Sequence, residues 1–329
     1  MTKSALHIDG IAKAFGNHIA VDGVSFEVQR GVVYGILGPN GAGKSTILRM
    51  INDIIAPDRG SIRILGELPP GPAAAAKIGY LPEERGLYPK MKVGEIVEFM
   101  GELRGMSRAE SRKRGGAWLE RLGLGKWTKN KVQDLSKGMQ QKVQFATALL
   151  HDPELVVLDE PWSGLDPINA EVLREVVAEI RASGRTVLFS THQMEQAEKI
   201  VDAVCIIARG KMVLEGKLRE LKKTIWGGRG HQAWIALGFA DDVSRDKAHA
   251  LLHDRALVAA QRPPHSSEVT DCEVQTAEGV EPQQLLAMLI AAGVGLRHFE
   301  IMVPTLHQIF VESVGPEAAV AERTEGEAA

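Results

Sequence analysis

Two kinds of hydrophobic pattern alternate along the first two thirds of the chain. Continuous apolar runs, at residues 32–37, 155–158 and 186–190, are typical of strands that are buried on both faces of a sheet. Apolar residues spaced three and four apart, as over residues 172–180, predict an amphipathic helix. Buried strands that alternate with helices predict an α/β domain built on a parallel sheet.

Two stretches of this domain depart from that pattern. Residues 24–28 alternate between apolar and polar, and we expect them to form an antiparallel edge together with residues 6–8. The pattern turns helical over residues 93–150, where Ser136 is expected to cap the N-terminus of a helix. We therefore predict a first domain over residues 1–226 that contains a helical subdomain.

The chain changes character after the glycine-rich residues 226–230, which we interpret as a linker. The patterns beyond it predict strand, helix, strand, strand, helix and strand at residues 234–237, 247–252, 256–260, 269–274, 282–292 and 296–303. This βαββαβ order suggests a small ferredoxin-like α+β domain over residues 227–315. Residues 316–329 are rich in Glu and Ala, and we expect them to be disordered.

Composition narrows the classes of function. The chain has 39 Lys and Arg against 42 Asp and Glu, a net charge of −3, whereas nucleic-acid-binding proteins usually have a basic excess. We therefore predict no nucleic-acid partner. No apolar run approaches the roughly 18 residues of a membrane span, and residues 1–4 hold no apolar signal segment, so we expect a cytoplasmic protein. Cys205 and Cys272 lie far apart and are expected to be structural thiols.

A phosphate-binding motif follows the first continuous apolar run. Residues 38–45 fit the G-x-x-x-x-G-K-[ST] pattern of the P-loop, with an expected strand before them and an expected helix after them. Glycines let backbone N–H groups approach phosphate oxygens, and the helix N-terminus adds partial positive charge. The alternative, a glycine-rich turn without a ligand, does not account for the strand and helix. The expected nucleotide-binding residues here are Gly38, Pro39, Asn40, Gly41, Ala42, Gly43, Lys44, Ser45 and Thr46.

Further side chains that suit nucleotide chemistry lie near this motif or at strand ends. Lys44 is expected to reach the β- and γ-phosphates and Ser45 to bind Mg²⁺. Asp159 and Glu160 end a buried strand, where ligands bind in α/β sheets; Asp159 is expected to bind Mg²⁺ and Glu160 to polarise a water. The alternative is that both are ordinary turn carboxylates. From its spacing alone, Phe15 is more typical of the core than of a base-stacking aromatic.

With the P-loop and the two carboxylates, five further segments resemble, in the same order, the motifs of ATP-binding subunits of ABC transporters. These segments are Phe15 at the place of the adenine-stacking aromatic, Pro82-Glu83 at the place of a Pro-Gln loop, Leu135-Ser136-Lys137-Gly138-Met139 at the place of the LSGGQ signature, Ser163-Gly164-Leu165-Asp166 at the place of the D-loop, and His192 at the place of the switch histidine. The resemblance covers about residues 4–220 and changes our interpretation of Phe15 from a core residue to a stacking residue. The stretch at 80–88 and the C-terminal part are most similar to the sodium-export and drug-resistance type of exporter.

The chain departs from the family pattern at three places. Glu83 replaces a glutamine, so a charged group stands where the family has an amide. Lys137 and Met139 replace a glycine and a glutamine of the signature. Ser136 and Gly138 are kept, so a hydroxyl and a backbone N–H remain there to contact a γ-phosphate.

The resemblance implies a mechanism and partners. Two chains form a head-to-tail homodimer, in which ATP on the P-loop of one is covered by Ser136 and Gly138 of the other. Glu160 acts as general base, His192 senses the γ-phosphate, and Ser45, Asp159 and Glu83 hold Mg²⁺. The dimer drives transport, in the export direction, through separately encoded transmembrane permease subunits on the inner face of the membrane.

Two other functions compete with this interpretation. One is a soluble ABC ATPase that acts on ribosomes or nucleic acid; the single P-loop and the acidic balance argue against it. The other is a regulatory nucleotide-binding module, against which the intact Lys44, Ser45, Asp159 and Glu160 argue. The C-terminal domain either binds a small effector or braces the dimer, and we favour the brace.

Overall fold

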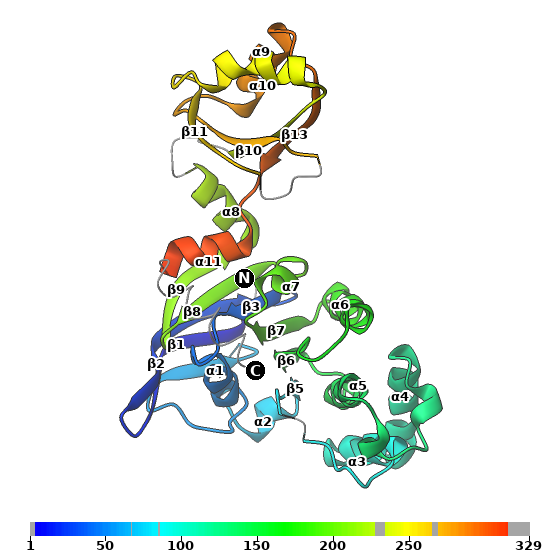
Figure 1. The fold of residues 1–329 in the computed structure, drawn as a ribbon. Coiled ribbons are helices and arrows are strands. Elements are labelled where there is room, and N and C mark those ends of the chain that lie inside the picture. The colour runs from blue at the N-terminus through cyan, green and yellow to red at the C-terminus, as the bar shows by residue number, and fades with distance from the viewer. Residues whose placement is uncertain (1–3, 67, 85, 228–233, 265–268, 315–329) are drawn as a thin grey trace. The chain divides into compact units, whose positions relative to one another are not determined.

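The computed structural model describes residues 4–66, 68–84, 86–227, 234–264 and 269–314. The chain divides into two compact units, Met1–Lys217 with Val311–Ala329, and Leu218–Phe310 (Figure 1). Our domain boundary at residue 226 falls within helix α8 (Leu218–Gly227) of the second unit. Residues 228–230 of the expected linker and the whole expected tail, 316–329, lie outside the described residues.

A six-stranded sheet forms the centre of the first unit. Its strand order is β5 (Ile78–Leu81), β6 (Leu155–Asp159), β7 (Thr186–Thr191), β3 (Val33–Leu37), β8 (Ala203–Ala208) and β9 (Lys211–Lys217). The first five are parallel, and β9 runs antiparallel to β8. Every residue of β3, β6 and β7 is buried, which accounts for their continuous apolar sequences. The predicted parallel sheet is confirmed.

A second, antiparallel sheet contains the strands that we expected at the edge of the first. Its order is β2 (His18–Gln29), β1 (Ser4–Phe15) and β4 (Arg59–Ile64). Strand β1 pairs with β2 on one side and β4 on the other, so these strands form a sheet of their own, and β9 supplies the antiparallel edge of the six-stranded sheet. Helix α1 (Lys44–Ile51) packs against strands of both sheets and joins them in one hydrophobic core.

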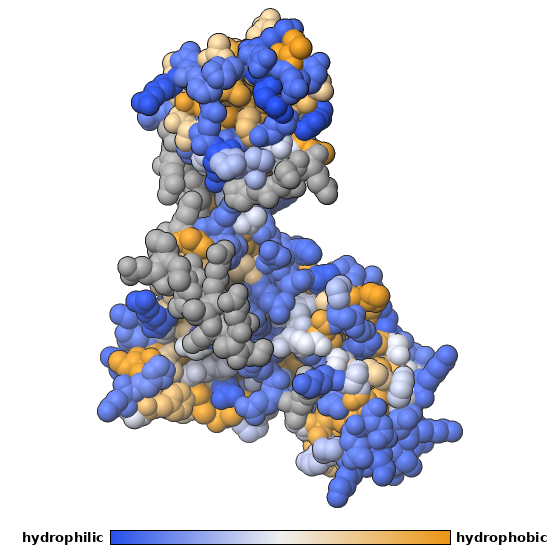
Figure 2. Space-filling view, in the orientation of Figure 1, coloured by the Kyte–Doolittle hydropathy of each residue, from blue (hydrophilic) through white to orange (hydrophobic). Residues whose placement is uncertain are grey.

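The helical pattern predicted over 93–150 is present and has its own core. It comprises α3 (Val93–Leu103), α4 (Arg108–Arg121), the short turns Gly125–Trp127 and Val132–Asp134, and α5 (Lys137–Leu149). Ser136 caps α5, because its hydroxyl accepts a hydrogen bond from the Met139 N–H. Hydrophilic residues cover much of the outer surface of this part (Figure 2). Helices α2 (Pro72–Ala75), α6 (Pro167–Ala182) and α7 (Met194–Glu198) complete the first unit.

The second unit has the predicted βαββαβ order. Its elements are β10 (Trp234–Phe239), α9 (Asp242–Leu252), β11 (Val258–Arg262), β12 (Cys272–Thr276), α10 (Pro282–Ala291) and β13 (Leu296–Met302). The sheet order is β11-β12-β10-β13, with every pair of neighbours antiparallel, which is the ferredoxin-like arrangement. Helices α9 and α10 lie over one face of this sheet (Figure 1). Helix α11 (Leu306–Val314) follows β13, and its residues from Val311 onward belong to the first unit.

None of the helices in the described ranges has both the length and the apolar character needed to cross a membrane.

Candidate functional site

The loop between β3 and α1 has a backbone shape that only glycine suits at several positions. Gly38 has a φ of +155°, and a Cβ on it would lie 2.1 Å from the Ile207 carbonyl oxygen. Gly43 has a φ of +103°, and its Cβ would lie 2.3 Å from the Ala20 carbonyl oxygen. Gly41 has a φ of +74° with open space beside it. The loop therefore curls tightly against β8 and β2 while its tip stays accessible to a ligand.

Lys44, at the start of α1, is buried inside this loop. Its Nζ donates hydrogen bonds to the carbonyl oxygens of Gly38, at 2.7 Å, and Pro39, at 3.0 Å. The same nitrogen lies 3.6 Å from Oε1 of Glu160, and Lys44 is only 5% exposed. Burial lowers the pKa of Lys44, and the nearby Glu160 carboxylate opposes that shift.

Asp159 ends strand β6 next to the first turn of α1. Its Oδ1 accepts hydrogen bonds from the hydroxyls of Ser45, at 3.1 Å, and Ser190. Burial raises the pKa of Asp159, and these two hydrogen bonds oppose the shift. A carboxylate and a hydroxyl oxygen side by side fit Mg²⁺, which takes oxygen ligands and completes its shell with water and substrate phosphates. Within the described ranges no group of three or more His, Cys, Asp or Glu is placed to hold a metal ion.

Both carboxylate oxygens of Glu160 contact neighbouring residues. Its Oε1 accepts from the His192 backbone N–H, at 3.1 Å, and lies 2.9 Å from His192 Nδ1; its Oε2 accepts from the Thr191 hydroxyl at 2.9 Å. Burial alone would raise the pKa of Glu160, but His192 and Lys44 outweigh it and lower the pKa below its usual value. Glu160 is therefore ionised at neutral pH.

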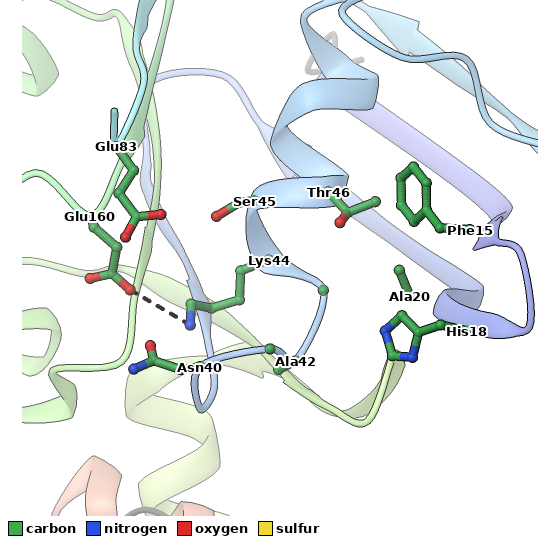
Figure 3. A pocket seen from close by; sticks show the side chains of 12 residues that line it. Phe15, His18, Ala20, Asn40, Ala42, Lys44, Ser45, Thr46, Glu83 and Glu160 are labelled. Carbon is green, nitrogen blue, oxygen red and sulfur yellow. Dashed lines mark ion pairs between the residues drawn. The ribbon is translucent and has the colours of Figure 1, made fainter. Parts of the chain in front are cut away.

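A cavity of about 390 Å³ joins these groups to the β1–β2 turn. It is lined by Phe15, His18, Ala20, Asn40, Gly41, Ala42, Gly43, Lys44, Ser45, Thr46, Glu83 and Glu160 (Figure 3). Figure 3 shows Phe15 and His18 on one side of the P-loop and the two glutamates on the other. The cavity is thus bounded by charged groups at one end and by a half-exposed aromatic ring at the other.

Sequence reasoning missed His18. It is the register partner of Phe15 across the β1–β2 turn, and opposed residues of an antiparallel pair project from the same face. The two-residue turn Gly16-Asn17, which places Phe15 and His18 opposite each other, was the signal that would have found it.

Glu83 reaches the cavity from the loop after β5. Burial raises its pKa, and the carboxylates of Asp159 and Glu160 add to the shift. Figure 3 shows the Glu83 and Glu160 side chains next to each other. The structure therefore places the Glu83 carboxylate beside that of Glu160 at this cavity.

Several of the expected site residues do not line the cavity. The carbonyl oxygens of Gly38 and Pro39 accept hydrogen bonds from Lys44, Asp159 accepts one from Ser45, and His192 contacts Glu160. Ser136 and Gly138 are absent from the cavity of their own chain. They lie at the accessible N-terminus of α5, where Gly138 passes close to Leu165.

The chain is similar to known proteins along most of its length. Residues 21–163 match the family model described as ABC transporter, and residues 216–314 match the model of the C-terminal domain of DrrA1-3-like ATP-binding proteins. The chain is 42% identical over 312 residues to an uncharacterized ABC transporter ATP-binding protein, YhaQ, of Bacillus subtilis (strain 168), covering 94% of this chain and 98% of that protein. It is 31% identical over 319 residues to the linearmycin resistance ATP-binding protein LnrL of the same organism, covering 94% and 98%.

A solved structure is similar to about two thirds of the chain. The dimeric structure of a bacterial ABC transporter cassette, MJ0796, matches with a TM-score of 0.61 and 27% identity, over 65% of this chain and 99% of that one.

Proposed function

This chain belongs to the family of ABC transporter ATP-binding proteins, which hydrolyse ATP, and we propose that it works as a head-to-tail homodimer that drives export through separate membrane subunits. The observation that carries the catalytic part is the meeting of Lys44, Asp159 and Glu160 beside the P-loop. Phosphoryl transfer depends mainly on positioning and charge neutralisation, which these groups can supply.

The two ends of the cavity bind different parts of ATP. The backbone N–H groups of residues 40–46 and the Lys44 ammonium hold the phosphates, because the loop and the N-terminus of α1 concentrate positive charge there. The Phe15 ring, half-exposed at the other end, stacks on the adenine. This assigns the phosphates and the base to opposite ends of one cavity.

Ser45, Asp159 and Glu83 would hold Mg²⁺, since their oxygens are the donors that this ion prefers. When bound, the ion neutralises charge on the phosphate oxygens. Asp159 and Ser45 are already joined by a hydrogen bond, so the protein sets their spacing before the ion arrives.

Glu160 takes a proton from the water that attacks the γ-phosphorus, while the bond to the ADP oxygen breaks. Its ionised state at neutral pH provides the acceptor, and the contacts from Thr191 and His192 orient it. His192, whose Nδ1 faces Glu160, presents the rest of its ring towards the γ-phosphate. The products are ADP and inorganic phosphate.

The homodimer accounts for Ser136 and Gly138. Both lie at an accessible helix N-terminus that suits an anion, yet neither lines the cavity of its own chain. In the dimer they cover the ATP bound to the other copy.

Transport requires membrane subunits that bind the dimer at the cytoplasmic face of the membrane. Export as the direction rests on the similarity to LnrL, a resistance protein. Recovery of a polytopic membrane protein with the tagged chain from gently solubilised membranes would support this role. Recovery with ribosomes or nucleic acid alone would contradict it.

Replacing Glu160 tests hydrolysis and dimerisation together. The Glu160→Gln variant keeps the size of the side chain but cannot accept the proton, so kcat should fall by about 100-fold or more while ATP still binds. With MgATP the variant should elute as a dimer in gel filtration.

The matched control is Glu154→Gln, which removes a surface carboxylate that pairs with Arg30 and Lys77 and should leave kcat unchanged. Hydrolysis by Glu160→Gln at the wild-type rate would reject Glu160 as the base. A variant that binds ATP but stays monomeric at high micromolar concentration would reject the homodimer.

A further inference from the structure

Two loops that bring carboxylates to the cavity are tied to the same helix. Glu160 and Pro161 follow β6, and residues 82–84 follow β5. Both loops accept hydrogen bonds from amide side chains of α5, the helix that Ser136 caps.

Gln141 holds the first loop. Its Nε2 donates to the Pro161 carbonyl oxygen at 2.6 Å and approaches the Glu160 carbonyl oxygen at 3.4 Å. The side chain is buried, with 9% of the residue exposed.

Gln144 holds the second loop in the same way. Its Nε2 donates to the Glu84 carbonyl oxygen at 3.0 Å and to the Pro82 carbonyl oxygen at 3.4 Å. Only 6% of the residue is exposed. The Gln144 amide thus binds the backbone on both sides of Glu83, and the Glu83 side chain lines the cavity.

The spacing of Gln141 and Gln144 on α5 lets the one helix hold both loops. Residues three apart on a helix lie on neighbouring positions of one face, so Gln141 and Gln144 point to the same side. Val143 and Phe145, both fully buried, fix this part of the helix in the interior. A rigid helix therefore sets the separation between the loop that carries Glu83 and the loop that carries Glu160.

The ion pair that joins the Glu83 loop to Arg49 is weak by comparison. Arg49 lies 3.4 Å from the Glu84 carboxylate, but the Glu84 side chain is 86% exposed, and exposed ion pairs contribute little. Among hydrogen bonds between described residues, those from Gln144 are the ones that hold the backbone of residues 82–84.

We propose that Gln144 is a positioning residue for Glu83: it holds the Glu83 carboxylate at a fixed place beside Glu160, on the ATP- and Mg²⁺-binding cavity. This inference rests on the proposed ATP hydrolysis, in which Glu83 is a ligand of Mg²⁺. Gln144 itself does not line the cavity, so it acts through the loop that it grips.

The test compares Gln144→Met with the wild-type full-length chain. Methionine has a similar length and no donor, so the loop loses its two hydrogen bonds while the core stays filled. We expect kcat to fall by about five- to tenfold and the Mg²⁺ concentration for half-maximal rate to rise. KM for ATP should change little, because the P-loop and Phe15 are untouched.

A double-mutant cycle with Glu83→Ala, which removes the carboxylate, separates positioning from general damage. If Gln144 acts through Glu83, Gln144→Met should add little to the loss already caused by Glu83→Ala. If the losses of the two substitutions multiply, the proposal is wrong. It is also wrong if Gln144→Met leaves kcat unchanged.

Two further variants serve as controls for this test. Thr128→Val removes a hydrogen bond to the Gly125 carbonyl in the helical part, far along the chain from either loop, and should keep kcat and the Mg²⁺ dependence. If Gln144→Met does not fold, Gln144→Asn, which keeps the donor but is one methylene shorter, should show the same loss. A wild-type chain that hydrolyses no ATP would refute the proposed function itself, a result distinct from either outcome above.

Discussion

Glu160 holds a backbone conformation that side chains rarely adopt. Its φ is +46°, in the left-handed region, directly after a buried strand. Such a conformation costs on the order of 1 kcal/mol or more in a residue other than glycine. The contacts from Thr191, His192 and Lys44 hold the carboxylate in place and offset that cost. The strain lies at the residue that we propose as the base.

Phe15 offers a test of the base end of the cavity. Phe15→Leu removes the aromatic face but keeps an apolar side chain, so we expect ATP affinity to fall by about tenfold, as for the loss of one stacked base. Stability should hardly change, because the ring is half-exposed. Equilibrium binding of a fluorescent ATP analogue measures the effect.

The control for Phe15 is Ile19→Ala on the neighbouring strand. Ile19 is similarly exposed but does not line the cavity, so ATP affinity should stay at the wild-type value. Equal affinities for Phe15→Leu and the wild type would show that the ring does not stack on the base.

At the scale of elements, helix α5 combines three tasks. Its N-terminus presents Ser136 to solvent, its middle holds two loops through Gln141 and Gln144, and its apolar residues complete the core of the helical part. A structural substitution in this helix should therefore affect both stability and the site.

A pair of N-cap variants separates these effects. Ser136→Ala and Ser107→Ala each remove a hydroxyl that caps a helix, so each should lower the free energy of unfolding by about 1 kcal/mol. Only Ser136→Ala should also lower the ATPase rate, because only Ser136 is proposed to contact ATP on the other copy. Denaturant unfolding and steady-state rates measure the two quantities. Equal ATPase rates in both variants would argue against that contact.

The sequence predicted much of the site because its chemistry lies in local patterns. The P-loop, Asp159 and the helix cap at Ser136 depend on residues close together in the chain. Gln141 and Gln144 escaped notice, because on sequence alone they are polar residues of a helix, and their importance depends on loops that the fold brings to them.

Strand limits and pairing were the weaker part of the prediction. We expected a strand only at residues 6–8, whereas β1 spans Ser4–Phe15. The register shifts between Ile8 and Ile11 and again beyond it, so bulges break the period-two alternation from which strands are recognised. Long-range pairing with β4 then decides to which sheet β1 belongs. Neither effect is visible in a local pattern.

At the scale of the whole molecule, the chain has separate cores in its two units. The core of the sheets and the core of the helical part lie in the first unit, and a third core lies in the ferredoxin-like unit, with no residue in common. Each unit therefore has its own basis for stability, and a destabilising change in one is expected to leave the other folded.

His151 makes the stability of the first unit depend on pH. Its Nε2 lies 3.0 Å from the Ile78 carbonyl oxygen, and its buried Nδ1 has no partner among the described residues. Burial, aided by Arg104, lowers its pKa below the usual 6.5. Between pH 6.5 and the lower pKa of the folded state, the unfolded chain binds a proton that the folded chain does not, so the free energy of unfolding should fall as the pH falls through this range.

The measurement compares the wild type with His151→Gln, which keeps a donor for the Ile78 carbonyl but does not titrate. Between pH 7 and pH 5 the wild type should lose more stability in urea unfolding of the first unit than the variant. Parallel losses in the two proteins would show that His151 does not contribute.

The hydrogen bonds from Lys44 to the carbonyl oxygens of Gly38 and Pro39 order the P-loop when the protein folds, before any nucleotide binds. They close the loop with a side chain of the protein itself, so its shape belongs to the fold. Fixing the backbone of one residue costs about 1–2 kcal/mol in conformational entropy. For the P-loop this cost is part of the free energy of folding, so it does not recur at each binding event. A nucleotide that arrives in each turnover has no loop to order, and its contacts can contribute fully to affinity.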